Sequence, residues 1–413
     1  MTTTPRRVAI TGLGTFNPLG TDVDSTWKAA LAGTSGARTL ENDWTEAYGL
    51  SVNFACSVAG DPLTVLSRPE SKKLDPVGQY ALIAAREAWR DAGTPDVDPT
   101  RLGVVVGSGI GGVWTLLDQW DVVREKGARR VNPFTVPMLM ANSSTAHIEI
   151  EFGAKAGAHT PVSACATGAE AVAHAADMIR SGRADMVICG GAEACIHPLP
   201  LAAFANMRAL STRRDDPATA SRPYDRDRDG FVLAEGSGIL VLESEEHAQA
   251  RGARMYAYVA GRGMASDAYH IAAPDEDGQA RAMREALALA DISPKDVVHV
   301  NSHGTSTPLG DIGELNAIRT AFDGQTDQIV VSSTKSMTGH LLGGAGALET
   351  IFAVLAAHHR VAPPTINIEN LDPEVHMDIA NGAPRELPSG DIAVLNNAFG
   401  FGGHDIALIM TTA

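Results

Sequence analysis

The chain has 413 residues, a formal net charge of −16, 44% hydrophobic residues and 20% charged residues. This length predicts two domains or one large duplicated domain, with enough apolar sequence to bury a sizeable core. The acidic balance argues against non-specific binding to nucleic acid or to an anionic membrane surface, although a local basic patch would still allow an acidic protein partner.

The chain carries no sequence signal for export, membrane insertion or structural metal. The opening stretch MTTTPRRVAITGLG lacks an apolar signal-peptide region of the usual length, and no later run is long and apolar enough to span a bilayer. We therefore expect a cytoplasmic protein. The 4 Cys lie at irregular spacing without a CxxC pair or a Cys/His cluster. This spacing argues against a disulfide framework and against zinc.

The first elements alternate between apolar strands and helices. Residues 8–11 predict a buried strand that runs into a Gly-rich turn, whose G-L-G lacks the third glycine of a dinucleotide-binding fingerprint. Helical patterns follow at residues 24–33 and 75–93, the second with Asp75 as N-cap. Residues 101–112 (RLGVVVGSGIGG) form another apolar strand that ends in glycines. Such alternation predicts a mainly parallel sheet covered on both faces.

The second half of the chain weakly repeats a pattern of the first half. Residues 159–179 predict a strand, a sharp turn of small residues and a helix, and residues 328–359 predict the same order. Each is followed by an apolar strand that ends in glycines, at residues 184–194 and 391–405. Chance similarity between Ala/Gly-rich segments is one explanation. The other is a duplicated βαβ-type domain in which strand ends from both halves meet at one site.

Cys165 heads the helix predicted for residues 166–182. A thiol at a helix N-terminus meets the positive end of the macrodipole, which favours the thiolate, and nearby N–H groups can form an oxyanion hole. Two interpretations stay open on this stretch alone, because a cysteine among alanines is more often a core residue than a nucleophile. Cys56, Cys189 and Cys195 lack this arrangement and are interpreted as structural.

Two histidines follow in the second half. His303 comes after an apolar strand in VVHVNSHGTSTPLGD, and His340 heads a glycine-rich helix in SSTKSMTGHLLGGAGALE, with Lys335 five residues earlier. Each histidine alone is also explained as a satisfied core or surface residue. Together they lie at strand-to-loop transitions. There two neutral imidazoles can stabilise a developing enolate, and a cysteine facing them can carry an acyl group.

Four ordered motifs, SACATGAEA, HGTSTPLGD, KSMTGHLLGGAGALE and NNAFGFGGHD, resemble those of the elongating β-ketoacyl-ACP synthases (type I/II) of the thiolase superfamily. The resemblance covers essentially the whole chain and is closest to actinobacterial synthase II and the ketosynthases of type II polyketide pathways. It implies an α/β, thiolase-like fold with duplicated βαβ-type halves and mainly parallel mixed sheets in α-β-α-β-α layers. We place the halves at residues 1–250, with the cysteine, and 251–413, with the histidines and the gating loop.

The resemblance implies a decarboxylative Claisen condensation. Cys165 would accept the acyl chain from acyl carrier protein, and His303 and His340 would bind the malonyl thioester carbonyl and assist decarboxylation. Lys335 would give electrostatic support near His340, and Glu349 could pair with it. The chemistry needs no cofactor and no metal, because loss of CO2 drives formation of the carbon–carbon bond. Some relatives hold a structural monovalent cation at the positions of Asn301, Glu349, Asn396 and Asn397.

The resemblance also assigns residues around the cysteine. Phe401 would gate the site, its N–H and that of Cys165 would form the oxyanion hole, and neighbouring glycines would let the loop swing. These glycines are Gly400, Gly402 and Gly403. Thr305 and Thr307 would contact the phosphopantetheine arm, and Ile110 would line the acyl pocket. Without the resemblance, FGFGGHD is better explained as a tight turn before a last strand.

Acyl carrier protein is strongly acidic, so the resemblance implies a basic docking patch on this acidic chain. The candidates by family position are Lys72, Lys73, Arg208 and Arg213, with Arg214 nearby. For each of them an ordinary solvated surface charge is an equally good explanation. The family forms dimers, which implies a homodimer, or a heterodimer with a chain-length factor in a specialised polyketide or polyene pathway.

Related activities fit the sequence less well. A thiolase calls for a second reactive cysteine late in the chain, and no cysteine follows Cys195. A starter synthase of the III type is expected to have Asn in place of His340. A cysteine hydrolase has no need of the second histidine with Lys335, and a non-catalytic chain-length factor is expected to lack the nucleophile, whereas Cys165 is present.

Overall fold

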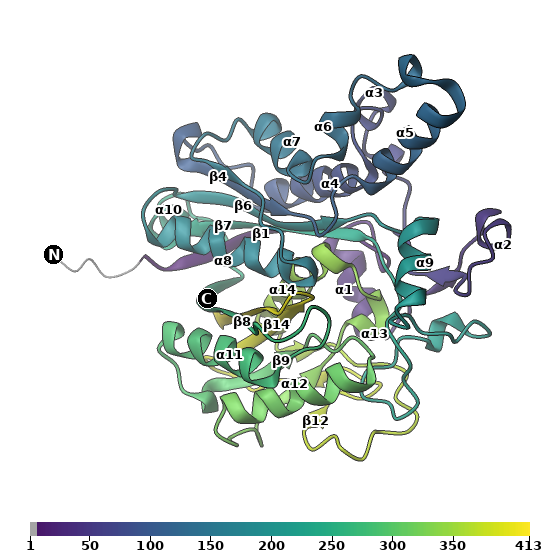
Figure 1. The fold of residues 1–413 in the computed structure, drawn as a ribbon. Helices are drawn as coiled ribbons and strands as arrows, with labels where there is room; N and C mark the ends of the chain where they lie inside the picture. Colours follow the sequence, from purple (N-terminus) through teal and green to yellow (C-terminus); the bar gives the residue numbers. More distant parts are fainter. Residues whose placement is uncertain (1–5) are drawn as a thin grey trace.

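A computed structural model describes residues 6–413, and its centre is an eleven-stranded mixed sheet (Figure 1). The strand order is β12-β10-β9-β14-β15-β8-β1-β7-β6-β4-β5. The strands are β1 (Val8–Phe16), β4 (Leu102–Gly107), β5 (Ala158–His159), β6 (Met186–Glu193), β7 (Gly236–Ser244), β8 (Ala257–Ser266), β9 (Val297–Asn301), β10 (Val330–Ser332), β12 (Asp378–Ile379), β14 (Ala393–Gly400) and β15 (His404–Thr412).

The sheet consists of two similar halves. In one half β5, β4 and β6 are parallel, and in the other β12, β10, β9 and β14 are parallel. Every pairing between β14 and β6 along the order is antiparallel. The expected parallel character therefore holds for the outer strands only, which confirms a mixed sheet. The halves join through β1 and β8, where only Ala9 and Ile10 pair with the second half.

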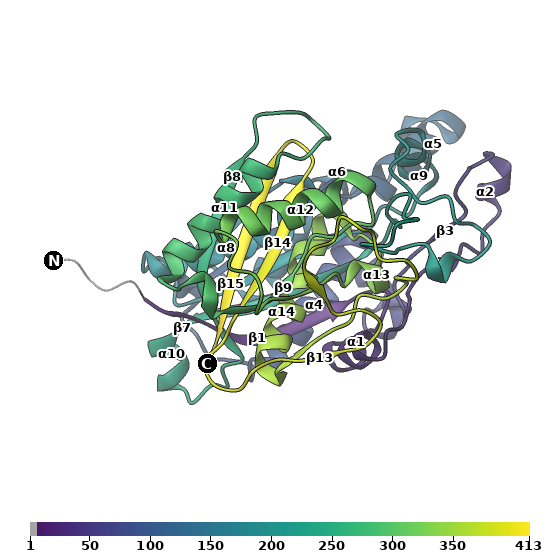
Figure 2. The ribbon, with the colours of Figure 1, turned by 90° about the horizontal axis from the view of Figure 1, so that it is seen from below.

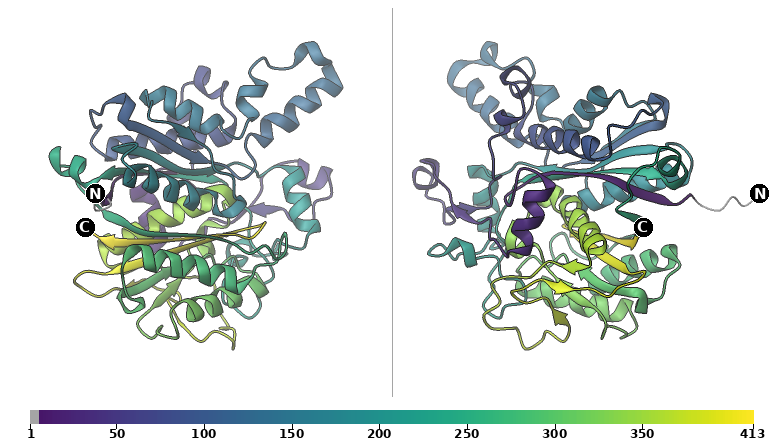
Figure 3. Two further views of the ribbon diagram at one scale, coloured as in Figure 1. Left: turned by 60° about the vertical axis from the view of Figure 1, so that its left-hand side comes forward. Right: turned by 180° about the vertical axis from the view of Figure 1, so that it is seen from behind.

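Helices form three layers around the two halves of the sheet, as expected (Figure 3). α8 and α14 lie between the halves and contact each other, α4 and α7 cover the outer face of one half, and α11 and α12 lie on the outside of the other (Figures 1 and 2). These helices are α4 (Pro76–Asp91), α7 (Ser143–Phe152), α8 (Thr167–Arg180), α11 (Glu276–Ala290), α12 (Pro308–Ala321) and α14 (Ala345–His359).

Small residues explain how α8 and α14 share one central layer. A Cβ on Gly168 would lie 2.6 Å from the Ala347 nitrogen, and a Cβ on Gly346 would lie 2.7 Å from the Ala169 nitrogen. Both distances are shorter than any ordinary contact, so each helix needs a glycine where it meets the other. The similar GAE and GAG stretches of the two halves therefore have a packing function at the point where the halves meet.

The first strand is longer than the sequence predicts. β1 continues through Gly12 and Gly14 to Phe16, so the expected Gly-rich turn after residue 11 is wrong. The reason is close packing, since a Cβ on Gly12 would lie 2.2 Å from the Ala88 carbonyl oxygen of α4. These glycines therefore let the α4 backbone pack directly against the strand, and they do not begin a loop.

Two local predictions have clear outcomes. α4 begins as expected, because the Asp75 carboxylate accepts a hydrogen bond from the Val77 N–H and Pro76 occupies the first turn. Within residues 6–413, no helix combines the length and apolar character needed to cross a membrane.

Candidate active site

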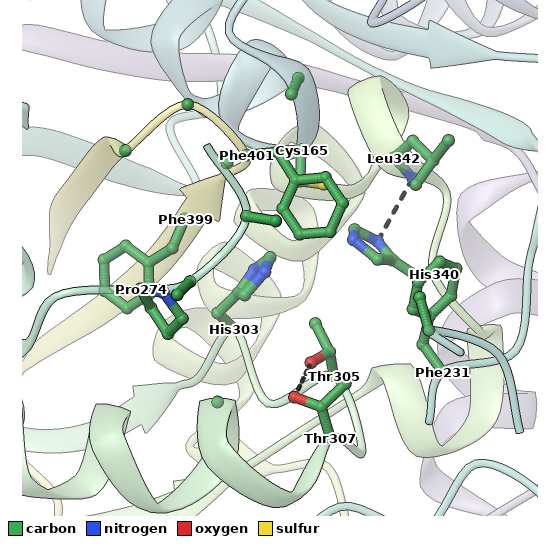
Figure 4. A pocket seen from close by; sticks show the side chains of 18 of the residues that line it. Cys165, Phe231, Pro274, His303, Thr305, Thr307, His340, Leu342, Phe399 and Phe401 are labelled. Carbon is green, nitrogen blue, oxygen red and sulfur yellow. Dashed lines mark hydrogen bonds between the residues drawn. The ribbon is translucent and has the colours of Figure 1, made fainter. Parts of the chain in front are cut away.

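A cavity of about 640 Å³ lies where strand ends of the two halves meet, and Cys165, His303 and His340 all line it (Figure 4). Cys165 comes from the first half of the chain and both histidines come from the second. The sequence-predicted catalytic groups therefore share one cavity.

Cys165 lies in a tight turn, η4 (Ala164–Ala166), immediately before α8. Ala164 has a left-handed backbone with φ 50°, a strained conformation for a residue with a Cβ. Thr167 supports the turn, because its hydroxyl accepts from the Ser163 N–H and donates to the Ala164 carbonyl oxygen. The turn presents the sulfur to the cavity while the residue stays buried.

The resting Cys165 is a thiol. Burial raises the pKa of the Cys165 thiol to about 12, and the nearby Lys335 ammonium and the Phe401 N–H offset this only in part. Removal of the sulfur from water therefore opposes the thiolate that a helix N-terminus is expected to favour. Deprotonation of Cys165 must accompany its reaction with substrate.

His303 follows β9 and is fixed through its backbone and its ring. The backbone N–H of His303 donates to one Glu314 carboxylate oxygen over 2.8 Å, and the Gly304 N–H donates to the other oxygen over 2.8 Å. The Lys335 ammonium lies 3.3 Å from His303 Nδ1 and donates to the His303 carbonyl oxygen over 2.7 Å. Because an ammonium is only a donor, Nδ1 is the acceptor and the ring proton resides on Nε2.

His340 is held by a neighbouring segment of the first half. The backbone N–H of His340 donates to the Val232 carbonyl oxygen over 2.8 Å, and the His340 carbonyl oxygen accepts from the Ala234 N–H over 3.0 Å. The Leu342 N–H lies 3.3 Å from His340 Nδ1 and donates to it, which again leaves the ring proton on Nε2. Phe231 packs edge-on against the ring, with centroids 5.2 Å apart.

Both imidazoles are neutral. Burial lowers the pKa of His303 and of His340 well below the usual range, and the positive charge of Lys335 lowers both further. The ring centroids lie 5.4 Å apart and the planes are almost perpendicular. Two neutral N–H donors in one cavity can bind a single carbonyl oxygen that gains negative charge.

Lys335 acts on His340 through its charge, as expected, and also contacts His303, which the sequence did not suggest. Its ammonium contacts His303 and not His340, and it forms a buried ion pair with Glu349, as expected. Lys335 begins the short helix α13 (Lys335–Thr338), whereas His340 follows that helix. The chain turns between the two residues, so the ammonium makes its hydrogen bonds to His303 while its charge still reaches His340.

Phe401 lies in a tight turn between β14 and β15, over Cys165 (Figure 4). Gly402 and Gly403 have φ of 93° and 74°, a conformation that glycine adopts readily. Gly400 serves a different purpose, since a Cβ there would lie 2.3 Å from the Ser163 carbonyl oxygen. The turn is thus both tightly wound and in direct contact with the backbone of the cysteine turn.

The remaining predicted binding residues divide into two groups. Thr305, Thr307 and Ile110 line the cavity, and the two threonine hydroxyls lie 3.0 Å apart. Among the basic candidates Arg208 also lines the cavity and is exposed. The other three, Lys72, Lys73 and Arg213, do not line it.

Sequence reasoning missed two buried carboxylates at the site. Glu314, on α12, holds the His303 loop, and Glu193, the last residue of β6, lines the cavity beside Cys165. Glu314 lies eleven residues after His303, in a helix that begins at Pro308. The one sequence signal for its contact with the His303 loop was an acidic residue on a helix face that is otherwise buried. Glu193 gave no signal beyond its position at the end of an apolar strand.

Comparison with protein families decides the classification. The model of the β-ketoacyl synthase N-terminal domain matches residues 5–248, and the model of the C-terminal domain matches residues 256–369. The chain belongs to the β-ketoacyl synthase family. Both family models together cover most of the chain.

Named relatives of this β-ketoacyl synthase agree with the classification. The 3-oxoacyl-[acyl-carrier-protein] synthase 2 of Mycobacterium tuberculosis is 43% identical over 97% of this chain and 96% of its own length. The enzyme of the same name from Staphylococcus aureus is 45% identical over 98% of each chain.

Solved ketosynthase structures share the fold. A type II polyketide ketosynthase in complex with its acyl carrier protein is 32% identical with a TM-score of 0.91, covering 99% of this chain and all of its own. The ishigamide ketosynthase/chain length factor is 34% identical with a TM-score of 0.89 and the same coverage. The thiolase-like fold expected for this β-ketoacyl synthase is confirmed.

Proposed function

We propose that this chain is a 3-oxoacyl-[acyl-carrier-protein] synthase, an acyltransferase that condenses an acyl chain held on Cys165 with malonyl-ACP and lengthens the chain by two carbons. The observation that carries this proposal is one cavity holding a cysteine thiol, two neutral histidines with Nε2–H donors, and Phe401 beside the cysteine. Each half-reaction uses a different part of this set.

In the first half-reaction the Cys165 sulfur attacks the thioester carbonyl of acyl-ACP. The carbon–sulfur bond to Cys165 forms, the bond to the pantetheine sulfur breaks, and the thiol proton leaves with the pantetheine thiol. The Phe401 N–H, which lies near enough to the sulfur to lower the thiol pKa, would then stabilise the oxyanion together with the Cys165 N–H. A protonated resting thiol protects the buried nucleophile until substrate arrives.

In the second half-reaction the malonyl thioester carbonyl accepts hydrogen bonds from His303 and His340. The bond to the carboxylate breaks, CO2 leaves, and its electron pair becomes the enolate stabilised by the two Nε2–H donors. The enolate carbon attacks the thioester on Cys165, the carbon–sulfur bond to Cys165 breaks, and the released thiolate takes up one proton from solvent water. Lys335, as a positioning residue, keeps Nδ1 of His303 unprotonated by donating to it.

Access to the site involves the turn between β14 and β15 and the pantetheine arm. We assign Phe401 as the gate, with Gly402 and Gly403 as the flexible positions and Gly400 as the contact that seats the turn on Cys165. Thr305 and Thr307 present adjacent hydroxyls to the amides of the arm.

Partner recognition follows from charge. Arg208 at the cavity mouth is the strongest candidate for docking the acidic carrier protein, with Lys72, Lys73 and Arg213 as further candidates. We propose a dimer and divide the chain near residue 250 into its two halves. The cytoplasmic location expected from the sequence stays a prediction.

A second function within the same chemistry is a ketosynthase subunit of a specialised polyketide or polyene pathway, paired with a chain-length factor. Structural similarity to the ishigamide ketosynthase/chain length factor favours it. The synthase 2 relatives have higher sequence identity, 43–45% against 32–34%, and favour elongation of ordinary acyl chains.

Substrate preference and oligomeric state distinguish the two functions. The purified protein is given malonyl-ACP with saturated or polyene acyl-ACPs, products are identified by mass spectrometry, and subunit composition is measured by native mass spectrometry. A homodimer that extends saturated chains supports the main proposal. Activity only with polyene chains, or only after a chain-length factor is added, would replace it by the second function.

A further inference from the structure

Glu193 is a fully buried carboxylate in the wall of the cavity, and none of the catalytic steps above uses it. It accepts hydrogen bonds from the Ser108 hydroxyl at 2.9 Å, the Gly109 N–H at 2.9 Å and the Gly343 N–H at 3.1 Å. The Ile110 N–H lies near enough to lower the pKa of this carboxyl slightly. A buried carboxylate surrounded by donors from two separate segments holds those segments together.

The first segment carries the acyl-pocket residue. Ser108, Gly109 and Ile110 form the turn after β4, and the Ser108 hydroxyl also accepts from the Gly111 N–H at 2.9 Å. Glu193 thus fixes the turn at Ser108 and Gly109, directly before Ile110, which lines the cavity.

The second segment orients a catalytic histidine. Gly343 lies in η7 (Leu342–Gly344), and the Leu342 N–H is the donor that holds Nδ1 of His340. The two segments touch at their backbones, because a Cβ on Gly343 would lie only 2.3 Å from the Gly109 nitrogen. The N–H groups of Gly109 and Gly343 lie side by side here, and both donate to the same oxygen of the Glu193 carboxylate.

We propose that Glu193 is a positioning residue that fixes the Ile110 turn of the first half to the His340 loop of the second half, and so sets both acyl-chain selectivity and malonyl decarboxylation. This inference rests on the proposed roles of Ile110 and His340. Burial raises the pKa of Glu193 to about 7, opposed by its hydrogen bonds, which is consistent with a carboxylate retained for its acceptor geometry.

Replacement of Glu193 tests the proposal. In Glu193→Ala, the two segments lose their common acceptor, and a displacement of about 1 Å at His340 lowers decarboxylation of malonyl-ACP by about 10²-fold. The ratio of kcat/KM for a short and a long saturated acyl-ACP also changes. Glu193→Gln restores both readouts, because its carbonyl oxygen can accept from both glycines while its amide donates to Ser108.

The matched control is Glu87→Ala. Glu87 is also a largely buried carboxylate that accepts from two backbone N–H groups, those of Thr15 and Val23, but it does not line the cavity. All rates are divided by the number of active sites titrated by Cys165 alkylation. We expect this control to lower thermal stability while leaving the rate per site and the chain-length ratio unchanged.

Three results would overturn the proposal: a uniform loss of all activities in Glu193→Ala, no change in either readout, or failure of Glu193→Gln to restore them. If the alanine variant does not fold, Glu193→Asp replaces it, since the shorter carboxylate cannot reach both segments and is expected to change the same readouts. His340→Ala distinguishes failure of the proposed function from failure of this inference alone. Unchanged decarboxylation in that variant refutes the proposed function, whereas the expected loss there with an unchanged Glu193→Ala refutes this inference alone.

Discussion

Lys335 donates to the carbonyl oxygen of His303 over 2.7 Å and lies 3.3 Å from its Nδ1, so one ammonium fixes the loop, the ring and the tautomer of His303. Glu349 balances this charge in a pair that is almost completely buried. The residue pair joins α13, the His303 loop and α14, and it explains why the imidazole stays neutral with its proton directed away from Lys335.

Removal of Lys335 is expected to affect both folding and decarboxylation. Lys335→Met leaves Glu349 buried without its partner, and breaking a buried pair costs about 3–5 kcal/mol of unfolding free energy. The double variant Lys335→Met with Glu349→Gln regains part of this stability in urea denaturation but does not regain malonyl decarboxylation. Recovery of decarboxylation in the double variant would mean that Lys335 has no role in orienting His303.

Alkylation of Cys165 by iodoacetamide is expected to accelerate with pH without reaching a plateau up to about pH 10. With a thiol pKa of about 12, the thiolate fraction rises about tenfold per pH unit over this range. The measurement is the pseudo-first-order rate of mass increase, with Cys165→Ala as the control for the other cysteines. A plateau near neutral pH would show instead that the helix N-terminus stabilises a thiolate.

Gly400→Ala is expected to abolish acylation of Cys165 with a folded protein remaining. The new Cβ would lie 2.3 Å from the Ser163 carbonyl oxygen and 3.3 Å from the Cys165 nitrogen, so the cysteine turn or the Phe401 turn must move. The matched control is Gly313→Ala in α12, where the nearest atom is 3.6 Å away. That change favours the helix by about 1 kcal/mol. Equal acylation rates in both variants would refute the contact as a requirement.

Asp405→Asn is expected to stabilise the protein at alkaline pH. Burial and the neighbouring Asp267 carboxyl raise the pKa of Asp405 from 3.8 to about 9. Between those values the folded chain keeps a proton that the unfolded chain has released, so this group's contribution to stability is lost as pH rises toward about 9. An asparagine at this position cannot ionise. Asp275 and Arg281 also influence this site.

Chemical denaturation from about pH 5 to about pH 9 measures this effect. The variant should gain stability relative to the wild type as pH rises, whereas the exposed control Asp277→Asn should follow the wild type. A constant difference between Asp405→Asn and the wild type across this range would contradict a raised pKa of Asp405 in the folded protein.

The sequence predicted most of the residues that line the shared cavity, because these residues lie in short motifs at strand ends. Cys165, His303 and His340 were each ambiguous alone, and the resemblance to one family grouped the three residues that the structure places in one cavity. Apolar strands and N-cap signals also predicted the alternation of strands and helices. These features are local, so the chain carries them in adjacent residues.

Features that depend on tertiary contact were not predictable. Gly12 and Gly14 look like a turn, yet they lie within β1 because α4 packs on them. The partner of Lys335 depends on how the chain turns after α13, and the pKa of Cys165 depends on burial beneath the turn of Phe401. Such contacts join residues that are far apart in the chain, so no local sequence pattern predicts them.

The most direct test of the account is intact-mass analysis of the protein during the two half-reactions. Incubation with acyl-ACP should add one acyl group to the wild type and none to Cys165→Ala. Addition of malonyl-ACP should then remove that group and yield a 3-ketoacyl product two carbons longer, slowly or not at all in His303→Ala and His340→Ala. Acylation of the Cys165→Ala variant, or extension at the wild-type rate without both histidines, would contradict it.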